Sequence, residues 1–281
     1  MMVSVVLNIM NEERYIADLL DSLVIQEQPM EVIVVDAASK DRTQDIVRRY
    51  AERYPFIKMY IKPGTRGEST NYGVSKASGE IVAFTGGDDL ANPNWVRELR
   101  KAFQQGADIV AGRSIMIGLK GWEDLDRVEL YHKGYDISFP SANMAFRRKV
   151  LDKVGGFDTW FITAEDIDLN FRSVDAGYHI TYNPDAVIYR RTKGTMYGFY
   201  RQAFWNGAGR KQLTLKHGNL WGKYDPLRMF KQKMTFWAFT RLIFAFLGYF
   251  AFKLFSDKGP YGKKAQAVPA SKQAAQGKNG P

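Results

Sequence analysis

Two adjacent carboxylates, Asp88 and Asp89, follow an apolar run that ends in two glycines, in the stretch Val-Ala-Phe-Thr-Gly-Gly-Asp-Asp. The run Ile81 to Phe84 has the character of a buried strand, and ligands bind outside the carboxyl ends of strands in open α/β sheets. Neighbouring carboxylates repel each other unless a cation or a donor group is present. Oxygen ligands of this kind suit Mg²⁺ or Mn²⁺, with a diphosphate completing the shell. The alternative is an acidic turn, because Gly-Gly-Asp-Asp is also ordinary turn chemistry.

Further polar residues follow other strand-like runs. Asp36 ends an apolar run and is a candidate for hydrogen bonding a ribose or a base edge, with a turn or helix-capping role as the alternative. Arg190 and Arg191 follow the last such run and could hold a diphosphate, or form a solvated basic turn. The chain has no GxGxxG or Walker sequence, which excludes a dinucleotide or P-loop fingerprint.

Three acids, Glu165, Asp166 and Asp168, fall in the first turn of a helix that the apolar spacing predicts to begin near Ala164. Acids at this place complement the helix dipole, which explains them without any catalytic role. The functional alternative is a general base at the start of the helix, directed at the same site.

The elements that must position these residues alternate between strand and helix. This alternation predicts a doubly wound α/β fold with right-handed crossovers. The ends of the first two strands, at Asn8 and Asp36, should then lie beside Asp88. We expect strands at 3–7, 31–35, 57–61, 81–84, 107–112, 180–182 and 187–189, helices at 15–25, 44–54, 69–77, 93–103, 149–154 and from 164, and a loop leading into a strand at 138–146.

The 281 residues, 45% of them hydrophobic, suffice for one large α/β domain with an appendage. There is no cysteine, so any metal must be held by oxygen or imidazole. The net charge of +10 lies in the C-terminal third, where residues 190–281 hold 18 Lys or Arg but only Asp225 and Asp257 as acids. Such asymmetry indicates an anionic partner, and the interspersed aromatic residues favour a membrane over nucleic acid.

The C-terminal third has its own pattern. Helices are predicted at 197–202 and 229–234, and His217 is expected at the surface. The most apolar stretch, 234–255, is interrupted by Arg241 and flanked by basic residues at both ends, which favours a membrane-bound or re-entrant helix over a single span. A core helix is the remaining option. We therefore expect a catalytic domain at 1–195, a basic, aromatic, membrane-associating region at 196–257 and a disordered tail at 258–281.

Taken together, residues 3–191 resemble the family 2 glycosyltransferases with the GT-A fold, a mostly parallel central sheet flanked by helices. The resemblance rests on landmarks that occur in the family's order. These are Ser4–Ile16 with its Asn-Glu loop, Val34–Thr43, Asn71-Tyr-Gly73, Ala77-Ser-Gly79, Asn143–Arg148, Gly155–Asp158 and Glu165–Leu169.

The resemblance implies a nucleotide-sugar donor, a divalent cation (Mg²⁺ or Mn²⁺) and an inverting transfer. It assigns Asp166 as catalytic base, Asp36 to the nucleoside and Asp88 to the metal, with Asp89 beside it. The predicted donor-binding set is Asn8, Asn11, Glu12, Asp36, Arg66, Asn71, Gly87, Arg190 and Arg191.

Three departures from the family pattern concern the diphosphate side of the site. Gly86 stands where the first acid of Asp-x-Asp is expected, and Thr70 stands where a basic residue often precedes Asn71, a role that Arg66 could take. Arginines replace the histidine often found after the last strand, so the site should rely partly on arginine for the diphosphate.

The sequence thus predicts a membrane-associated glycosyltransferase at the cytoplasmic face of the cell membrane, with a lipid-linked acceptor. One alternative is a soluble or protein acceptor. A sugar nucleotidyltransferase is another, although the turn from Asn8 to Glu13 lacks the Gly-rich basic loop it would usually show. A non-enzymatic membrane-binding module is the third.

Overall fold

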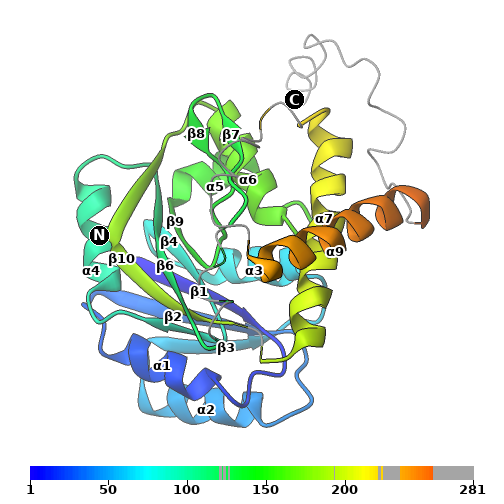
Figure 1. Cartoon of the computed structure of the whole chain (residues 1–281). Coiled ribbons are helices and arrows are strands. Elements are labelled where there is room, and N and C mark those ends of the chain that lie inside the picture. Colours follow the sequence, from blue (N-terminus) through cyan, green and yellow to red (C-terminus); the bar gives the residue numbers. More distant parts are fainter. Residues whose placement is uncertain are drawn as a thin grey trace, which may run out of the picture.

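A single curled sheet with helices on both faces forms the body of the molecule (Figure 1). The computed structural model describes residues 1–119, 122, 125, 127–192, 194–220, 223 and 235–255. The predicted helix at 229–234 and the predicted tail at 258–281 lie outside these residues. The strands are β1 (Val3–Ile9), β2 (Met30–Asp36), β3 (Ile57–Ile61), β4 (Ile81–Gly86), β5 (Asp89–Ala91), β6 (Ile109–Ile117), β7 (Tyr131–His132), β8 (Tyr135–Asp136), β9 (Asn143–Arg147) and β10 (Ile180–Arg191).

The order of strands in the main sheet is β3-β2-β1-β4-β9-β6-β10-β5, and β7 and β8 form a separate hairpin. The pairs β1–β2, β1–β4, β2–β3 and β6–β10 are parallel, whereas β9 runs antiparallel to β4 and β6, and β5 runs antiparallel to β10. The predicted α/β fold with a mostly parallel sheet is confirmed. The two strands expected at 180–182 and 187–189 are one strand, with a register shift between Asn183 and Val187.

Two hydrophobic cores sandwich the sheet, because alternate residues of its buried strands point to opposite faces. Val5 and Leu7 pack with α1, α2 and α4, whereas Val6 packs on the other face with α3, α5 and α6. The helices are α1 (Ile16–Val24), α2 (Thr43–Arg53), α3 (Arg66–Lys76), α4 (Trp95–Gln104), α5 (Arg148–Val154), α6 (Glu165–Asp175), α7 (Met196–His217) and α9 (Phe236–Phe255).

Helix α3 begins three residues earlier than predicted because Thr65 caps it. The Thr65 hydroxyl accepts the Glu68 N–H at 3.3 Å, and the Glu68 carboxylate accepts the Thr65 N–H at 2.7 Å. This reciprocal capping box satisfies two backbone donors that a helix start leaves unpaired. The consequence for the site is that Arg66 becomes the first residue of α3 rather than part of a loop.

Helix α7 extends to His217, far beyond the helix predicted at 197–202. It packs against α6 through a third core that includes Phe171, Val174 and Leu213. Helix α9 lies across α7 on the side away from the sheet (Figure 1). The C-terminal region therefore adds two helices to one flank of the α/β body.

Candidate active site

The carboxyl ends of β1, β2 and β4 meet at one edge of the sheet. The parallel register places Asn8 opposite Val35 and Gly86, and Ile9 opposite Asp36. The predicted adjacency of these three strand ends is confirmed. Since the strands are buried and end in polar residues, the edge exposes side chains suited to binding a ligand.

Asp88 lies in the turn between β4 and β5, in contact with the loop that follows β1. A methyl group built on Gly87 would lie 2.9 Å from the side chains of both Glu12 and Ile9, so that loop packs directly on the turn. The main-chain carbonyl of Asp88 accepts a hydrogen bond from Arg191 at 3.0 Å. The structure thus brings Glu12, Gly87, Asp88 and Arg191 together, and their contacts with a donor remain predictions.

Asp89 points into the protein and is only 1% exposed. Its Oδ2 accepts the Gly86 N–H at 2.9 Å, and its Oδ1 lies 3.4 Å from Arg190 Nε. Burial raises the pKa of the Asp89 carboxyl, against the opposing charge of Arg190. The two acids predicted as metal ligands therefore have different surroundings. The Asp89 carboxylate contacts the turn backbone at Gly86 and the Arg190 side chain, whereas Asp88 is the more accessible carboxylate.

The glycine at position 86 has a steric explanation. A methyl group built there would lie 2.8 Å from Asp89 Oδ2 and 3.2 Å from Asp88 Oδ1. An acidic side chain at position 86 would therefore not fit with Asp89 in its observed position. The departure from the family's acid pattern is therefore part of the packing of this turn.

Arg66 connects the donor edge with the start of α6. Its carbonyl accepts a hydrogen bond from Asn8 Nδ2 at 2.9 Å, and its guanidinium lies 3.4 Å from Glu165 Oε1. Glu165 is 3% exposed, and its Oε2 has no hydrogen-bond partner among the described residues. Burial raises the pKa of Glu165 to about 7; the charge of Asp166 acts in the same direction and that of Arg66 opposes it.

Asp166, the predicted base, follows Glu165 at this junction and is partly exposed. Its Oδ2 accepts the Ser141 N–H at 3.1 Å, and its Oδ1 accepts the Ile167 N–H at 2.8 Å. The preceding Ala164 has φ = 66°, a left-handed conformation that costs a non-glycine residue about 1–2 kcal/mol. Strain of this kind persists only where neighbouring contacts fix the backbone. The preceding residue provides one such contact, because the Thr163 hydroxyl donates a hydrogen bond to the Trp205 carbonyl of α7 at 2.8 Å.

Asp168 serves packing rather than the site. It is fully buried, forms ion pairs with Arg172 at 2.8 Å and Lys216 at 2.7 Å, and is hydrogen-bonded to His217 Nε2 at 2.7 Å. The expectation that His217 lies at the surface is wrong. Its ring stacks on Phe171 with centroids 4.0 Å apart, because the long α7 returns its C-terminal end to α6.

Three of the predicted donor-binding residues make hydrogen bonds that fix the conformation of loops. The buried Asp36 accepts hydrogen bonds from the Ser39 N–H at 2.7 Å and from Gln44 at 2.9 Å, as in its turn alternative. The Asn71 side chain makes two bonds of 2.8 Å to the Phe157 main chain. Their contacts with a donor remain predictions, as does that of Asn11, whose Oδ1 accepts the Lys40 N–H at 2.9 Å.

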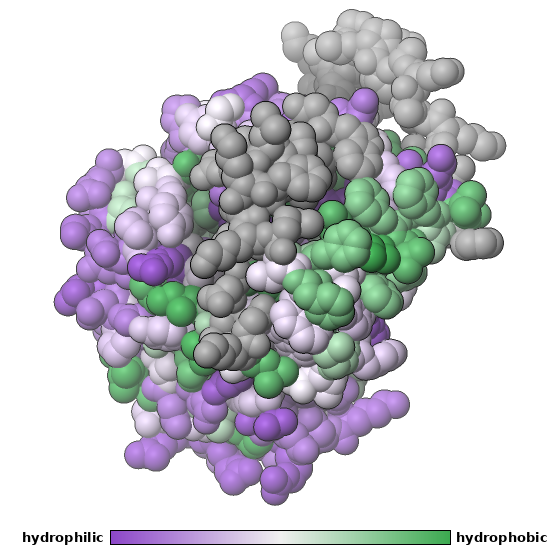
Figure 2. Space-filling model, viewed as in Figure 1, coloured by the Kyte–Doolittle hydropathy of each residue, from purple (hydrophilic) through white to green (hydrophobic). Residues whose placement is uncertain are grey.

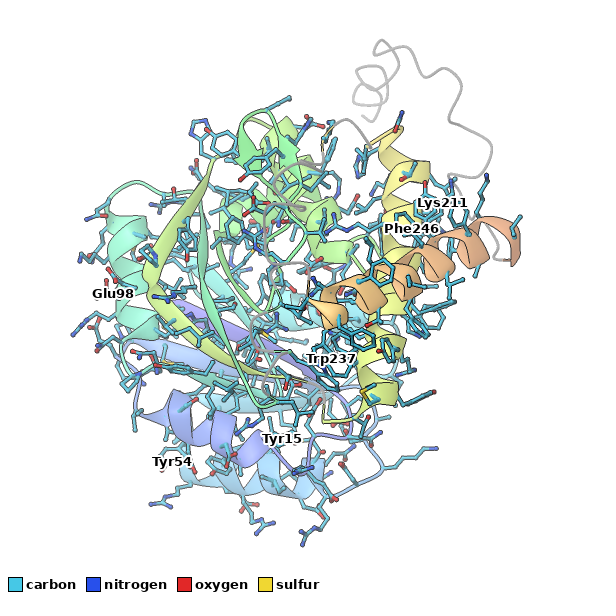
Figure 3. The ribbon with its side chains drawn as sticks, viewed as in Figure 1. Tyr15, Tyr54, Glu98, Lys211, Trp237 and Phe246 are labelled. Carbon is cyan, nitrogen blue, oxygen red and sulfur yellow. The ribbon has the colours of Figure 1, made fainter. Side chains whose placement is uncertain are left out.

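Sequence reasoning missed the part that α1 plays in this site. Arg191 lies 4.6 Å over the ring of Tyr15 and pairs with Asp18 at 2.7 Å. Figure 3 shows Tyr15 at the beginning of α1, on the lower side of the sheet. The separation of 173 residues between the ion-pair partners leaves no local signal of the contact.

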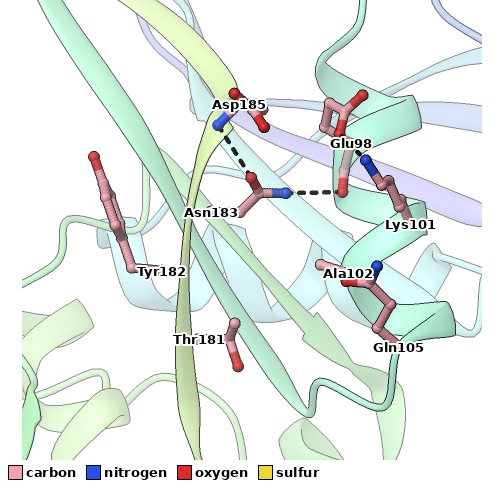
Figure 4. Close-up of a pocket in the computed structure, with 8 residues that line it drawn as sticks. All are labelled: Glu98, Lys101, Ala102, Gln105, Thr181, Tyr182, Asn183 and Asp185. Carbon is pink, nitrogen blue, oxygen red and sulfur yellow. Dashed lines mark hydrogen bonds and ion pairs between the residues drawn. The ribbon is translucent and has the colours of Figure 1, made fainter.

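A surface hollow between α4 and β10 does not coincide with the site. The hollow, about 220 Å³, lies between α4 and β10 and is lined by residues that include Glu98, Lys101 and Asn183 (Figure 4). None of the predicted site residues lines it. Within the described ranges, no cluster of three or more His, Asp or Glu side chains could hold a metal, so a cation at Asp88 would draw its other ligands from the donor or from water.

The fold is a doubly wound α/β domain, and its candidate site lies at the carboxyl ends of the strands, where such domains bind ligands. The family model described as glycosyl transferase family 2 matches residues 4–157, and that of glycosyl transferase family group 2 matches residues 81–256. The chain belongs to glycosyl transferase family 2, which confirms the predicted family and enzyme class.

Individual relatives agree with this placement. The chain is 30% identical over 237 residues to a probable glycosyltransferase, YdaM, of Bacillus subtilis, covering 76% of this chain and 56% of YdaM. A mannosyltransferase from Pyrobaculum calidifontis, solved with GDP-Man and Mn²⁺, has a TM-score of 0.63 at 22% identity, over 89% of this chain and 73% of that one. TarS of Staphylococcus aureus, solved with UDP, has a TM-score of 0.60 at 21% identity, over 84% and 76%. This chain spans between 56% and 65% of the length of the first three curated relatives.

Proposed function

We propose that this chain transfers a sugar from a nucleotide-sugar donor to an acceptor by a single inverting displacement. The observation that carries the proposal is the continuous contact from Asn8 through Arg66 to Glu165, which joins the donor edge of the sheet to Asp166. Family membership supplies the reaction class, and the solved relatives that hold UDP or GDP-Man support a nucleotide-sugar donor.

The reaction places the acceptor beside the helix start of α6. Asp166 takes the proton of the acceptor hydroxyl as that oxygen attacks the anomeric carbon, and the bond to the nucleoside diphosphate breaks on the opposite face. Arg190 and Arg191, at the end of β10, stabilise the negative charge that develops on the leaving diphosphate. A divalent cation (Mg²⁺ or Mn²⁺), held by Asp88, adds positive charge to the same oxygens when it is bound.

The acceptor we favour is lipid-linked, and the reaction would occur at the inner face of the cell membrane. Among the described helices, α9 alone is long and apolar enough to cross a membrane by length and composition, with a mean hydropathy of 1.3 over Phe236–Leu254. Its N-terminal Trp237 contacts Trp122, which follows the carboxyl end of β6, with ring centroids 5.6 Å apart. A soluble or protein acceptor is the alternative; family membership leaves a nucleotidyltransferase or a non-enzymatic membrane module without support.

The decisive experiment separates catalysis by Asp166 from its effect on the helix dipole. Asp166→Asn should abolish transfer while calorimetry shows donor binding within about twofold of wild type. Asp45→Asn is the matched control, because Asp45 also lies in the first turn of a helix but is exposed and pairs with Arg48 rather than with a predicted site residue. Substrates come from a calorimetric screen of sugar nucleotides with and without Mn²⁺. Full turnover by Asp166→Asn would exclude it as the base.

A further inference from the structure

Helix α9 exposes an unbroken apolar stripe. Seven side chains are between 39% and 69% exposed, and at about 100° per residue they fall within an arc of roughly 100° on one side of the helix. In Figure 2 a cluster of hydrophobic residues covers this helix, and Figure 3 places Phe246 on it. The stripe consists of Phe236, Phe239, Ile243, Phe246, Leu247, Phe250 and Leu254.

The opposite side of α9 is fixed to α7 by direct backbone contact. A methyl group built on Gly248 would lie 1.8 Å from the Phe204 carbonyl oxygen, and one built on Gly207 would lie 1.8 Å from that of Ala245. Only hydrogen fits at either position, so the two helices cross at the smallest separation their backbones allow. This side of α9 is covered by protein and cannot contact lipid.

Helix α7 is in turn fixed to the α/β body. Gln212 accepts the Ile162 N–H at 3.0 Å and donates to the Trp160 carbonyl at 2.8 Å. The ion pairs of Lys216 and His217 with Asp168 hold its C-terminal end. With α7 docked along its length, α9 cannot stand across a bilayer without drawing the catalytic body into the hydrocarbon.

The position of Arg241 agrees with a helix that has one side on protein. In the sequence this arginine interrupts the most apolar stretch of the chain. At about 100° per residue it falls roughly opposite the centre of the stripe, which is therefore apolar along its whole length. The interruption that argues against a span leaves the exposed face intact.

The charges around the stripe indicate its partner. Helices α7 and α9 together contain six Lys or Arg and no Asp or Glu. Lys253 is exposed at the end of α9, and Lys211 of α7 lies 5.2 Å over the Tyr249 ring. Pairing this face with a second copy would set cations against cations, whereas anionic lipid headgroups would neutralise them.

We propose that α9 lies in the plane of a membrane, with the stripe inserted at the boundary between headgroups and acyl chains of an anionic bilayer. An apolar helix face bordered by cations binds such an interface through buried apolar area and electrostatic attraction. The proposal specifies how the membrane association suggested above is built. Its tests use neither donor nor acceptor, so their outcome is independent of whether sugar transfer is the correct reaction.

The first test is flotation of the full chain with vesicles of phosphatidylcholine alone or with 30% phosphatidylglycerol. Wild type should bind the anionic vesicles at least tenfold more than the neutral ones. Leu247→Ser/Phe250→Ser should lose at least tenfold of that binding, whereas Ile25→Ser/Ile61→Ser, which removes apolar side chains of similar exposure elsewhere, should lose less than twofold. Equal loss in both variants, or a stripe variant that binds normally but turns a dimer into a monomer, would overturn the proposal.

The second test measures orientation and exploits the absence of cysteine. Single cysteines at Phe236, Ile243 and Leu254 carry a fluorophore, and lipids with nitroxides at defined depths quench it. A helix in the membrane plane gives the same shallow depth at all three positions. A middle position deeper than both ends, or ends that an impermeant quencher reaches from opposite sides, would show a span and refute the in-plane helix.

Discussion

Asp168→Asn tests whether the buried ion-pair cluster joins α7 to the catalytic body. Asp168 is fully buried; its Oδ2 contacts Arg172, and its Oδ1 contacts Lys216 and His217. Burial alone would raise the pKa of this carboxyl, but the hydrogen bond from His217 and the charges of Arg172 and Lys216 outweigh it and lower the pKa to about 2. The neutral amide keeps the shape of the side chain and removes the negative charge that pairs with Arg172 and Lys216.

Two routes give similar magnitudes for the loss. Lowering the pKa from 3.8 to about 2 corresponds to about 2–3 kcal/mol at neutral pH, since each unit is worth about 1.4 kcal/mol. Removing one partner from a buried ion pair costs about 3–5 kcal/mol. Lys216 keeps a second partner, Asp158, at 2.6 Å, so we expect the lower end, about 3 kcal/mol. For a chain of this size that is roughly 6–12 °C in Tm.

The assay combines urea unfolding at pH 7 with amide hydrogen exchange. Exchange should accelerate in 196–217 and stay slow in β1 and β4, because the variant releases α7 before the sheet opens. Wild type keeps this contribution above pH 3.8 and loses it as pH falls through about 2, a dependence that Asp168→Asn should lack. The control Asp45→Asn breaks an exposed pair worth roughly 0.5 kcal/mol or less. A loss below about 1 kcal/mol with unchanged exchange in α7 would refute the reasoning.

Three further predictions follow from the site. Burial raises the pKa of Glu165 to about 7, so its contribution to stability is fully present below about pH 4.5 and is lost as pH rises through 7. Glu165→Gln should therefore make Tm less dependent on pH over this range. An unchanged slope of Tm against pH would contradict the raised pKa of Glu165. Asp88→Asn should weaken Mn²⁺ binding at least tenfold, measured by calorimetry in the presence of donor. Asp89→Asn replaces a carboxyl that points into the protein and should change Mn²⁺ binding less than threefold. Equal losses in the two variants would show that both acids are metal ligands. Gly209→Ala should lower the free energy of unfolding by about 1–3 kcal/mol in urea, because the added methyl would lie 2.6 Å from the Thr163 carbonyl oxygen. A variant as stable as the wild type would show that α7 can shift at this position.

Local patterns in the sequence were sufficient for the α/β body. Continuous apolar runs predicted the buried strands, and their polar ends predicted which residues share the edge of the sheet, as the pairing of Asn8 with Gly86 confirms. The residues of β9 gave no such signal of direction, because an antiparallel strand inserted between β4 and β6 depends on where the chain returns. The length of α7 was also missed, because a helix was predicted only at 197–202, and Gly207 and Gly209 have low intrinsic helix propensity.

The roles of individual polar residues were harder to predict because composition does not reveal partners. Three acids stand within four residues of one another in the first turn of α6, yet the structure separates them. Asp168 is paired with Arg172 and with Lys216 of α7, Glu165 lacks a partner for one oxygen among the described residues, and Asp166 is held by the Ser141 main chain. Most of the contacts that distinguish them join residues 25 or more positions apart in the chain, such as that of Asp166 with Ser141.

The small residues at 207–209 of α7 join the two functional faces of the molecule. Gly207 meets the α9 backbone at Ala245, and Gly209 meets the backbone of Thr163, three residues before Asp166. Packed backbones have little room to slide, because any shift would force atoms into overlap. A helix with glycines on both sides therefore transmits the position of α9 to the turn that carries the proposed base. If α9 rests on a membrane, the distance of Asp166 from that surface is set by α7, and an acceptor anchored in lipid would meet the base at a fixed height.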